Sequence, residues 1–286
     1  MRPLQTAPSI RFTTKPTPSL HPHRAMASFF SPFVPTVGSD GPLAGKTLVL
    51  PATSFGNVGQ LACDLILNSV GTKKKCGYVH SKHVEACSYA YPFEKFGKDE
   101  AMEASLCLAQ ELYSIDDKVC VLQRRTLCFP DCTEAFSKET AAWVKSEGFK
   151  CVVLLAGADK GMGQGDSEVE SFMNVCATSA ALVSEAPLIE ALKKTGCQQF
   201  HNTSTLAEFP DTISGAGISK EFFSECERNG VPLVVLVTFT YEGNNTSDGG
   251  NMAEMVKLNI ESVGTAVASN PYGGTWRAPL SWKNIM

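Results

Sequence analysis

The stretch Lys46-Thr-Leu-Val-Leu-Pro51, followed after a short loop by Asn57 to Val70, decides the fold class. The first six residues form a short apolar run, which predicts a buried strand. In the second segment apolar side chains recur at helical spacing and predict a helix with one buried face. They are Val58, Leu61, Ala62, Leu65, Ile66 and Val70. Asn57 can cap the start of this helix, and Gly71 can close its end.

The rest of the chain repeats this alternation of strand and helix. Further strands are expected at 76–79, 151–156 and 232–239, and a β-hairpin is expected from 104–113 and 118–124, with Asp116-Asp117 at the turn. Helices are expected over 133–146, 187–194, 220–228 and 251–268, and loops over 157–171 and 241–250. Thr133 or Cys132 is the candidate cap of the first of these helices, and Gly148 ends it. Apolar strands that alternate with helices predict an α/β fold of three layers, a largely parallel sheet flanked by helices.

Composition restricts the kinds of partner. The chain has 286 residues, of which 43% are hydrophobic and 19% charged, as in ordinary globular proteins. Its net charge of −4 gives no global positive field that would attract nucleic acid or an anionic membrane. No apolar run approaches the roughly 18 residues needed to cross a bilayer. We therefore expect neither a nucleic-acid partner nor a membrane.

Cysteine usage indicates a reducing compartment. The chain has eleven cysteines, an odd number, and several lie inside apolar runs, including Cys63, Cys107, Cys120 and Cys151. A free cysteine packs as a small apolar residue. The pattern predicts buried thiols rather than a framework of disulfides.

The first 42 residues differ in character from the rest. Residues 1–39 carry no Asp or Glu and contain four basic residues among many Ser, Thr and Pro: Arg2, Arg11, Lys15 and Arg24. That composition resembles an organelle transit peptide. The alternative is a disordered extension, with Met26 as a second candidate start, and it is favoured because Pro-rich polar segments rarely pack. We predict a disordered extension over 1–42 and a single α/β domain over 43–286.

Two glycine-containing loops precede predicted helices, where α/β proteins often bind ligands. The first is Ser54 to Gln60, with Gly56 and Gly59, and the second is Ser214 to Ser219, in which Gly217 lies near a candidate cap, Ser219. Either loop could cradle a phosphate or a nucleoside. The favoured interpretation is structural: Gly56 makes a turn, Gly59 lets the helix approach the sheet, and 214–219 is a tight loop. A third segment, Gly41 to Thr47, misses the phosphate-binding P-loop pattern by one residue and precedes a strand instead of a helix.

Catalytic and metal-binding patterns are weak. His80, His83 and Cys87 are metal-ligand residue types without a Cys-x-x-Cys pair to complete a site, and Cys128 with Cys132 is no stronger. No Gly-x-Ser-x-Gly motif of a hydrolase occurs. Of the histidines only His80, His83 and His201 remain as acid or base candidates, and surface or core roles explain them equally well. We therefore assign no catalytic, cofactor-binding or metal-binding residue and expect no cofactor.

Several segments, in order along the chain, resemble the proteasome assembly chaperone 2 family. The most specific is Pro51 to Ala62, with its Gly-Asn-Val-Gly-Gln-Leu-Ala core. Further segments that fit are Ala142–Ser146, Ser214–Ser219, Tyr241–Asn244 and Thr275–Trp282. The resemblance spans roughly residues 43–283 and is collinear.

This resemblance implies a fold related to nucleoside phosphorylases without catalytic activity. It implies a cytoplasmic and nuclear chaperone that forms a heterodimer with proteasome assembly chaperone 1, binds proteasome α subunits and promotes the α ring of the 20S proteasome. Trp276 and Trp282 are candidate interface anchors, or they clamp the C-terminal tail onto the domain. The chain ends Asn284-Ile285-Met286, without the penultimate Tyr of some proteasome-binding tails, which argues against docking by this tail.

An alternative function is an enzyme that processes nucleosides or phosphate compounds on a similar fold. Its phosphate cradles would be the Gly56 and Gly217 loops, with Lys220 the only basic residue beside either. Organelle targeting by residues 1–39 is a weaker hypothesis.

Overall fold

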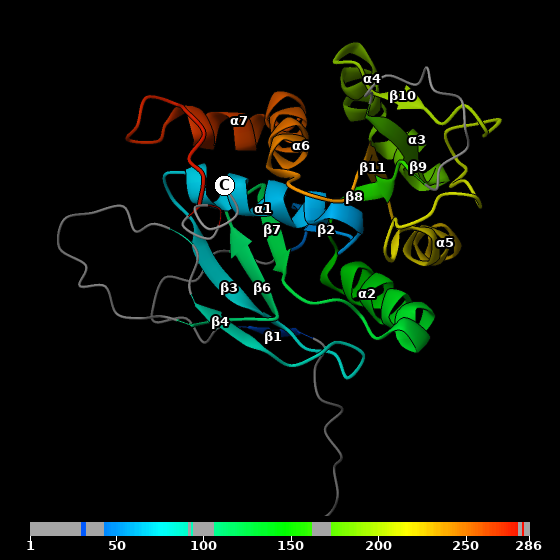
Figure 1. Ribbon diagram of the computed structural model, residues 1–286, viewed down its shortest axis with the longest axis horizontal. Helices are drawn as coiled ribbons and strands as arrows, with labels where there is room; N and C mark the ends of the chain where they lie inside the picture. Colours follow the sequence, from blue (N-terminus) through cyan, green and yellow to red (C-terminus); the bar gives the residue numbers. More distant parts are fainter. Residues whose placement is uncertain are drawn as a thin grey trace, which may run out of the picture.

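The computed structural model describes residues 30–32, 43–90, 93, 106–161, 173–279 and 282 (Figure 1). A nine-stranded sheet has the order β1-β3-β6-β7-β2-β8-β11-β9-β10, and β4 pairs with β5 separately. The strands are β1 (Phe30–Pro32), β2 (Thr47–Pro51), β3 (Lys74–Val79), β4 (Ser88–Ala90), β5 (Leu106–Leu108), β6 (Gln110–Ser114), β7 (Val119–Arg124), β8 (Cys151–Asp159), β9 (Asn174–Ala177), β10 (Gln198–Gln199) and β11 (Leu233–Thr240). The helices are α1 (Val58–Ser69), α2 (Thr133–Glu147), α3 (Ser179–Ser184), α4 (Ala186–Lys194), α5 (Ser219–Asn229), α6 (Thr246–Asn259) and α7 (Glu261–Ala268).

The centre of the sheet is parallel. Strands β7, β2, β8 and β11 run in one direction, and antiparallel pairs flank them, β3–β6–β7 on one side and β11–β9 on the other. The predicted three-layer fold with a largely parallel sheet is confirmed. The β6–β7 hairpin is also confirmed, with Asp116 Oδ1 accepting the backbone N–H groups of Lys118 and Val119 at its turn.

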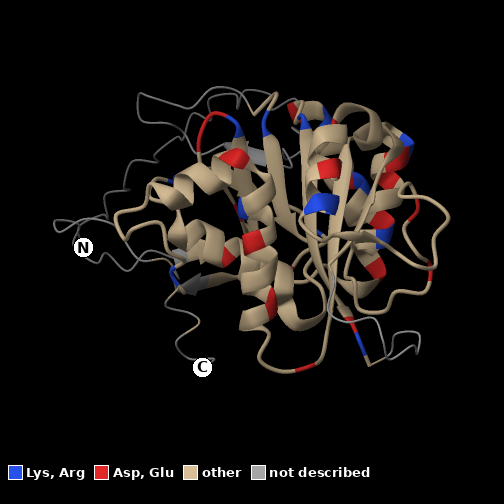
Figure 2. Cartoon of the chain, turned by 90° about the horizontal axis from the view of Figure 1, so that it is seen from above, with Lys and Arg blue, Asp and Glu red and all other residues tan. Residues whose placement is uncertain are grey.

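Helices cover both faces of the sheet. Helices α1, α6 and α7 lie on one face, and α2 and α5 lie on the other (Figure 1). Successive strand residues alternate between the two cores, as in β2, where Val49 faces α1 while Leu48 and Leu50 face α2 and α5. Burying each such side chain stabilises the fold by about 1.5–3 kcal/mol. Charged residues of both signs are spread over helices and loops rather than gathered in one patch (Figure 2).

The end of the chain departs from the predicted pattern. Helix α6 begins at Thr246, inside the predicted loop 241–250, and the expected helix 251–268 is broken at Ile260, whose φ of −115° and ψ of 98° are extended. The early start depends on Gly249, because a Cβ there would lie 2.6 Å from Leu61 Cβ of α1. Gly249, although glycine disfavours a helix in isolation, thus lets α6 approach α1 closely.

Several local predictions were wrong. Asn57 does not cap α1 with its side chain but adopts a left-handed conformation with φ of 54°. Helix α2 has Cys132 at its N-cap position without a side-chain cap bond, and α5 begins at Ser219 itself. Gly148 ends α2 as predicted, with φ of 71°. The elements β9, α3 and β10 were not predicted, because these segments are too short for periodicity to identify.

The predicted N-terminal extension contributes to the sheet. Within it, Phe30–Pro32 forms β1 and pairs antiparallel with β3. All other residues of 1–42, part of the loop predicted at 157–171, and the tail 284–286 lie outside the described residues. Within the described ranges no helix is both long enough and apolar enough to cross a membrane.

Candidate functional site

The two glycine-containing loops meet at the carboxyl ends of the parallel strands. We call residues 52–57 and 214–218, together with the end of β8, the glycine crossing. Phe55 N donates to Gly215 O at 2.7 Å, and Asp159 N donates to Ser214 O at 3.0 Å. Gly157 N donates to Ser54 Oγ at 2.7 Å. Sequence alone identified both loops but not that they lie in contact.

Carbonyl oxygens fill the space beside these glycines. A Cβ on Gly59 would lie 2.2 Å from Leu155 O, and one on Gly157 would lie 2.2 Å from Phe55 O. A Cβ on Gly217, which has φ of 62°, would lie 2.6 Å from Ala52 O. The structural interpretation of Gly59 is therefore confirmed: it lets α1 approach β8. A phosphate placed against these positions would face carbonyl oxygens, which repel it.

The crossing is also strained and tied down by hydrogen bonds. Thr53 is buried and has φ of 51°, a conformation that costs a β-branched residue about 1–3 kcal/mol. Thr53 Oγ1 donates to Ala52 O at 2.6 Å. Nearby, Thr240 Oγ1 lies 2.6 Å from Asn245 Oδ1 and 2.7 Å from Asp248 Oδ2. Strain of this kind persists only where the surrounding structure holds the backbone in place.

Lys46, the lysine of the segment that resembles a P-loop, is structural. Its side chain is buried, and Nζ donates to Ser114 Oγ and to Asp116 O, both at 3.0 Å. Strand β2 follows it, as predicted. The lysine therefore supports the β6–β7 hairpin instead of projecting toward a ligand.

The candidate histidine and cysteine ligands do not converge. His83 Nε2 lies 3.4 Å from Glu139 Oε1 on α2, while His80 and His201 are exposed. In the part of the chain that the structure describes, no group of three His, Cys, Asp or Glu side chains is arranged to hold a metal ion. No three of the residues considered for a zinc site, all of which the structure describes, therefore lie together.

The thiols singled out by the sequence are buried, as predicted. Burial, then the nearby Glu185 carboxylate, raises the pKa of Cys151 to about 12. Burial likewise raises the pKa of Cys197 to about 12 and raises that of Cys63 further. A thiol whose pKa is raised in this way is a poor nucleophile at neutral pH, because the thiolate is the reactive form.

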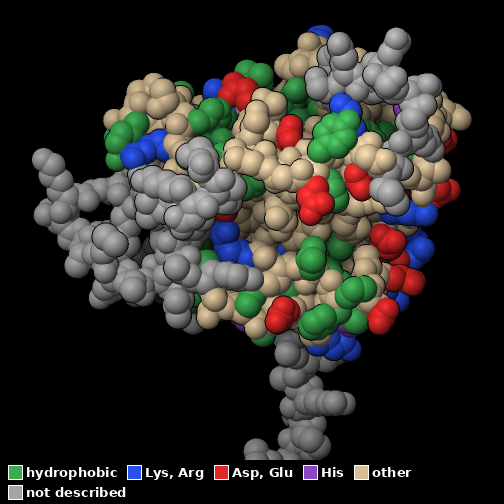
Figure 3. Space-filling model, in the orientation of Figure 1, with side chains coloured by type: hydrophobic (Ala, Val, Ile, Leu, Met, Phe, Trp, Pro, Cys, Tyr) green, Lys and Arg blue, Asp and Glu red, His purple; other side chains and the backbone are tan. Residues whose placement is uncertain are grey.

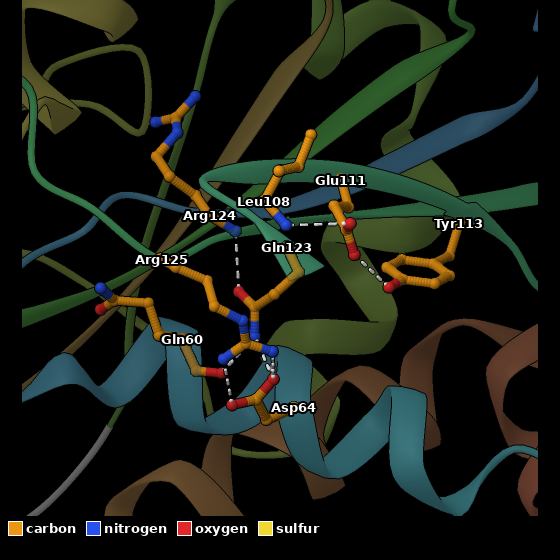
Figure 4. Close-up of polar contacts among 8 residues, drawn as sticks. All are labelled: Gln60, Asp64, Leu108, Glu111, Tyr113, Gln123, Arg124 and Arg125. Carbon is orange, nitrogen blue, oxygen red and sulfur yellow. Dashed lines mark hydrogen bonds and ion pairs between the residues drawn. The ribbon is translucent and has the colours of Figure 1, made fainter. Parts of the chain in front are cut away.

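A buried polar network between α1 and β7 was not predicted (Figure 4). The Asp64 carboxylate accepts two bonds from Arg125, at 2.6 and 2.9 Å, and one from Gln123 Nε2 at 2.5 Å. Burial alone would lower the pKa of Arg125, but the Asp64 carboxylate outweighs burial and raises it. The signal in the sequence is the pair Arg124-Arg125 at the end of an apolar strand.

Arg124 points to the opposite face of the sheet. It is fully buried, with its guanidinium carbon 4.6 Å from the centre of the Phe136 ring, and its Nε donates to Gln110 Oε1 at 2.9 Å. Burial lowers the pKa of Arg124 to about 10. The cation is thus held by an amide oxygen and an aromatic ring inside the α2 layer, while its Nη2 has no hydrogen-bond partner among the described residues.

The C-terminal tryptophans contact the domain itself. Trp282 is buried in the core beside α1, and Trp276 Nε1 donates to Glu254 Oε2 of α6 at 2.6 Å. Asn68 Nδ2 donates to Arg277 O at 2.9 Å, which ties the same segment to α1. Of the two roles considered for these residues, the clamp on the tail is the one observed.

On the face shown in Figure 3, apolar side chains lie scattered among polar ones. Among the described residues the exposed large apolar side chains are Leu108, Leu127, Phe129, Val183, Tyr241, Leu258 and Tyr272. Leu127 and Phe129 are 64% and 45% exposed and flank Cys128, whose segment pairs with Val84 in an isolated bridge. Phe129 N donates to His83 O at 2.9 Å, so this segment is held in an extended conformation. Two outward apolar side chains on a fixed backbone form a candidate contact surface for another protein.

Comparison with known proteins gives one consistent family. The model of the PAC2 family matches residues 48–244. A Nematostella vectensis protein named Proteasome assembly chaperone 2 is 31% identical over 224 residues, which cover 76% of this chain and 90% of the relative. The Homo sapiens protein of that name is 26% identical over 261 residues, which cover 88% of this chain and 95% of the relative.

Solved structures agree on the fold. Pyrococcus furiosus PbaA, an archaeal homolog of proteasome-assembly chaperone, superposes with a TM-score of 0.55 at 17% identity, over 79% of this chain and 83% of PbaA. Pyrococcus furiosus PbaB, an archaeal proteasome activator, superposes with a TM-score of 0.51 at 14% identity, over 84% of this chain and 90% of PbaB.

Proposed function

The chain belongs to the PAC2 family, and from this premise we propose that it is a proteasome assembly chaperone that acts by binding and not by catalysis. The observation that carries the proposal is the family match over residues 48–244, together with relatives named Proteasome assembly chaperone 2 that are aligned over most of their length. The close packing at the glycine crossing supports it, because the space beside Gly59, Gly157 and Gly217 is taken by backbone carbonyl oxygens.

More specifically, the chain forms a heterodimer with proteasome assembly chaperone 1, and this dimer binds proteasome α subunits and promotes the α ring of the 20S proteasome. Such work takes place where those subunits are found, in the cytoplasm and nucleus. The surface at Leu127 and Phe129 is the candidate contact with the partner chaperone, because apolar side chains in the centre of an interface supply most of its affinity.

The test is co-expression of the full chain with a candidate chaperone 1, followed by size-exclusion chromatography and a pull-down of free α subunits. We expect a 1:1 complex that captures free α subunits but not finished proteasomes. A chain that stays monomeric and ignores both would overturn the proposal. Nucleoside and phosphate binding would then be measured to examine the enzyme alternative.

The proposed contact surface is tested separately. Leu127→Asp and Phe129→Asp should each weaken the complex at least tenfold while the melting temperature of the isolated chain changes little. Val183→Asp is the matched control, since Val183 is 85% exposed and lies on α3. If all three variants bind the partner chaperone as tightly as the unchanged chain does, this surface is excluded as the contact. The chaperone proposal itself would still stand.

A further inference from the structure

Two thiols meet on the α2 face of the sheet, where β3, β6 and β7 lie side by side (Figure 1). Cys120 of β7 belongs to the core on that face, and Cys76 of β3 packs against the same core. The two side chains share a hydrogen bond. Because β6 lies between the two strands, this contact crosses a whole strand and does not follow from pairing within one ladder.

The backbone explains how the two thiols reach each other. In β6, Ser114 pairs with Lys74 of β3 on one side and with Cys120 of β7 on the other. The register between β3 and β6 shifts around Cys76, which is the extra residue of a β-bulge. A bulge re-aims the side chain that it carries and disrupts the ladder locally. Ser114 is small, so the sulfur atoms can meet above β6, and β3 can move at the bulge to the separation that a disulfide requires.

The two thiols differ in exposure. Cys76 is partly exposed, and its Sγ donates to Lys74 O at 3.5 Å. Cys120 is fully buried. A reagent from solvent can therefore reach Cys76 directly, whereas Cys120 can react only with the sulfur beside it. A solvent-accessible thiol next to a second, resolving thiol is the arrangement found in redox-sensing proteins.

A buried cation lies beside the pair. Lys46 Nζ donates to Ser114 Oγ at 3.0 Å, and Ser114 is in turn hydrogen-bonded to Cys120. The hydrogen bond with Cys76, followed by burial, raises the pKa of Cys120, while Lys46 acts in the opposite direction. Oxidation of Cys76 removes the largest cause of this rise. The charge of Lys46 then favours the Cys120 thiolate, which is the form that attacks another sulfur.

We propose that Cys76 and Cys120 form a reversible disulfide when the chain meets hydrogen peroxide. The Cys76 thiolate attacks one peroxide oxygen, so that an S–O bond forms, the O–O bond breaks and hydroxide leaves. Cys76 is thereby oxidised by two electrons to a sulfenic acid, and the peroxide is reduced. The Cys120 thiolate then attacks the Cys76 sulfur, so that the S–S bond forms, the S–O bond breaks and a second hydroxide leaves.

The protons released by the two thiols convert the two hydroxide ions to water. A dithiol reductant restores both thiols by exchange through a mixed disulfide. The proposal does not depend on the proteasome role.

The test uses the full chain in its reduced, folded state. The chain is treated with hydrogen peroxide and dimedone, which traps sulfenic acids, then alkylated under denaturing conditions and mapped by mass spectrometry. We expect a Cys76–Cys120 linkage within one chain that dithiothreitol reverses, while buried Cys151 stays reduced. Oxidation of Cys76 without the linkage, a linkage of Cys76 to another cysteine, or a reaction no faster than that of Cys87 would overturn the proposal.

Variants separate the two roles. Cys120→Ala should stop the reaction at the Cys76 sulfenic acid and raise its dimedone adduct about tenfold over the unchanged chain. Cys76→Ser should abolish both the adduct and the linkage. Cys87→Ser removes another partly exposed thiol and should change neither, as the matched control. An adduct no larger in Cys120→Ala than in the unchanged chain would contradict the role of Cys120. If that variant does not fold, the peptide map of the unchanged chain decides alone.

Discussion

The two ends of the parallel sheet differ in what occupies them. At the carboxyl end, where ligand sites of α/β proteins usually lie, carbonyl oxygens occupy the space beside Gly59, Gly157 and Gly217. At the amino end an open cleft of about 490 Å³ lies against the starts of β2 and β7, α4 and the junction between α6 and α7. The difference teaches that glycines in a loop where ligands often bind can serve close approach of backbone segments instead.

The largest expected effect is on the alkylation rate of a thiol near the amino end of the sheet, where the cleft lies. Cys151 follows Lys150 of the cleft directly in sequence but is itself buried, and its pKa is raised to about 12. At pH 8 its alkylation by iodoacetamide should be about a thousandfold slower than that of an ordinary thiol, and its rate should rise about tenfold per pH unit up to about pH 11.

Mass spectrometry of the intact folded chain measures this rate, with Cys87 and Cys132, which are partly exposed, as internal controls. The denatured chain should react at all eleven cysteines at similar rates. Rapid native labelling of Cys151 would mean that the cleft extends into the core and that the contrast between the two ends is larger than described.

The next largest effect is on the free energy of unfolding, and it is expected at the carboxyl end of the sheet. Gly157→Ala places a Cβ 2.2 Å from Phe55 O and should destabilise the protein by about 3 kcal/mol, measured by urea unfolding. Gly250→Ala is the matched control, because nothing lies within 4 Å of its Cβ position in α6, and it should stabilise by about 0.5–1 kcal/mol. If Gly157→Ala leaves the free energy of unfolding unchanged, the backbone at the glycine crossing shifts easily to accommodate the added Cβ.

A smaller effect is expected at the ion pair that ties α1 to the end of β7. Asp64→Ala leaves Arg125 without its carboxylate and should cost about 2 kcal/mol, less than for a fully buried pair because Arg125 retains some exposure. Glu190→Ala breaks an exposed pair with Lys193 and should cost less than about 0.5 kcal/mol. Thermal unfolding of both variants gives the comparison, and equal losses would contradict the assigned role of Asp64.

The smallest effect is expected at the amino end. Lys46→Met removes the bonds to Ser114 and Asp116 but keeps the apolar stem, so it should cost about 1 kcal/mol in unfolding experiments. Lys145→Met, which removes a single exposed bond to Asn229 O, should cost less. If Lys46→Met lowers the free energy of unfolding by 3 kcal/mol or more, the amino end is as sensitive to substitution as the glycine crossing.

By itself the sequence determined the fold class and the family. The alternation of apolar strands with helices of 3.6-residue period requires burial on both faces of a sheet, and the segment 51–62 carries the family resemblance. Local patterns also identified the β6–β7 hairpin, the end of α2 at Gly148 and the buried thiols, since each depends on residues close together in the chain.

Only the tertiary structure decided what the motifs do. Whether Gly56 and Gly217 cradle a ligand depends on which atoms from other segments fill the space beside them, and those atoms belong to residues such as Asn245 and Ala52. The start of α6 depends on contact with Leu61, and the clamp by Trp276 depends on Glu254. The cleft joins residues from 45 to 262, which no local pattern relates. Packing between segments distant in sequence is the physical reason, because a linear pattern specifies which faces are apolar but not which neighbours they meet.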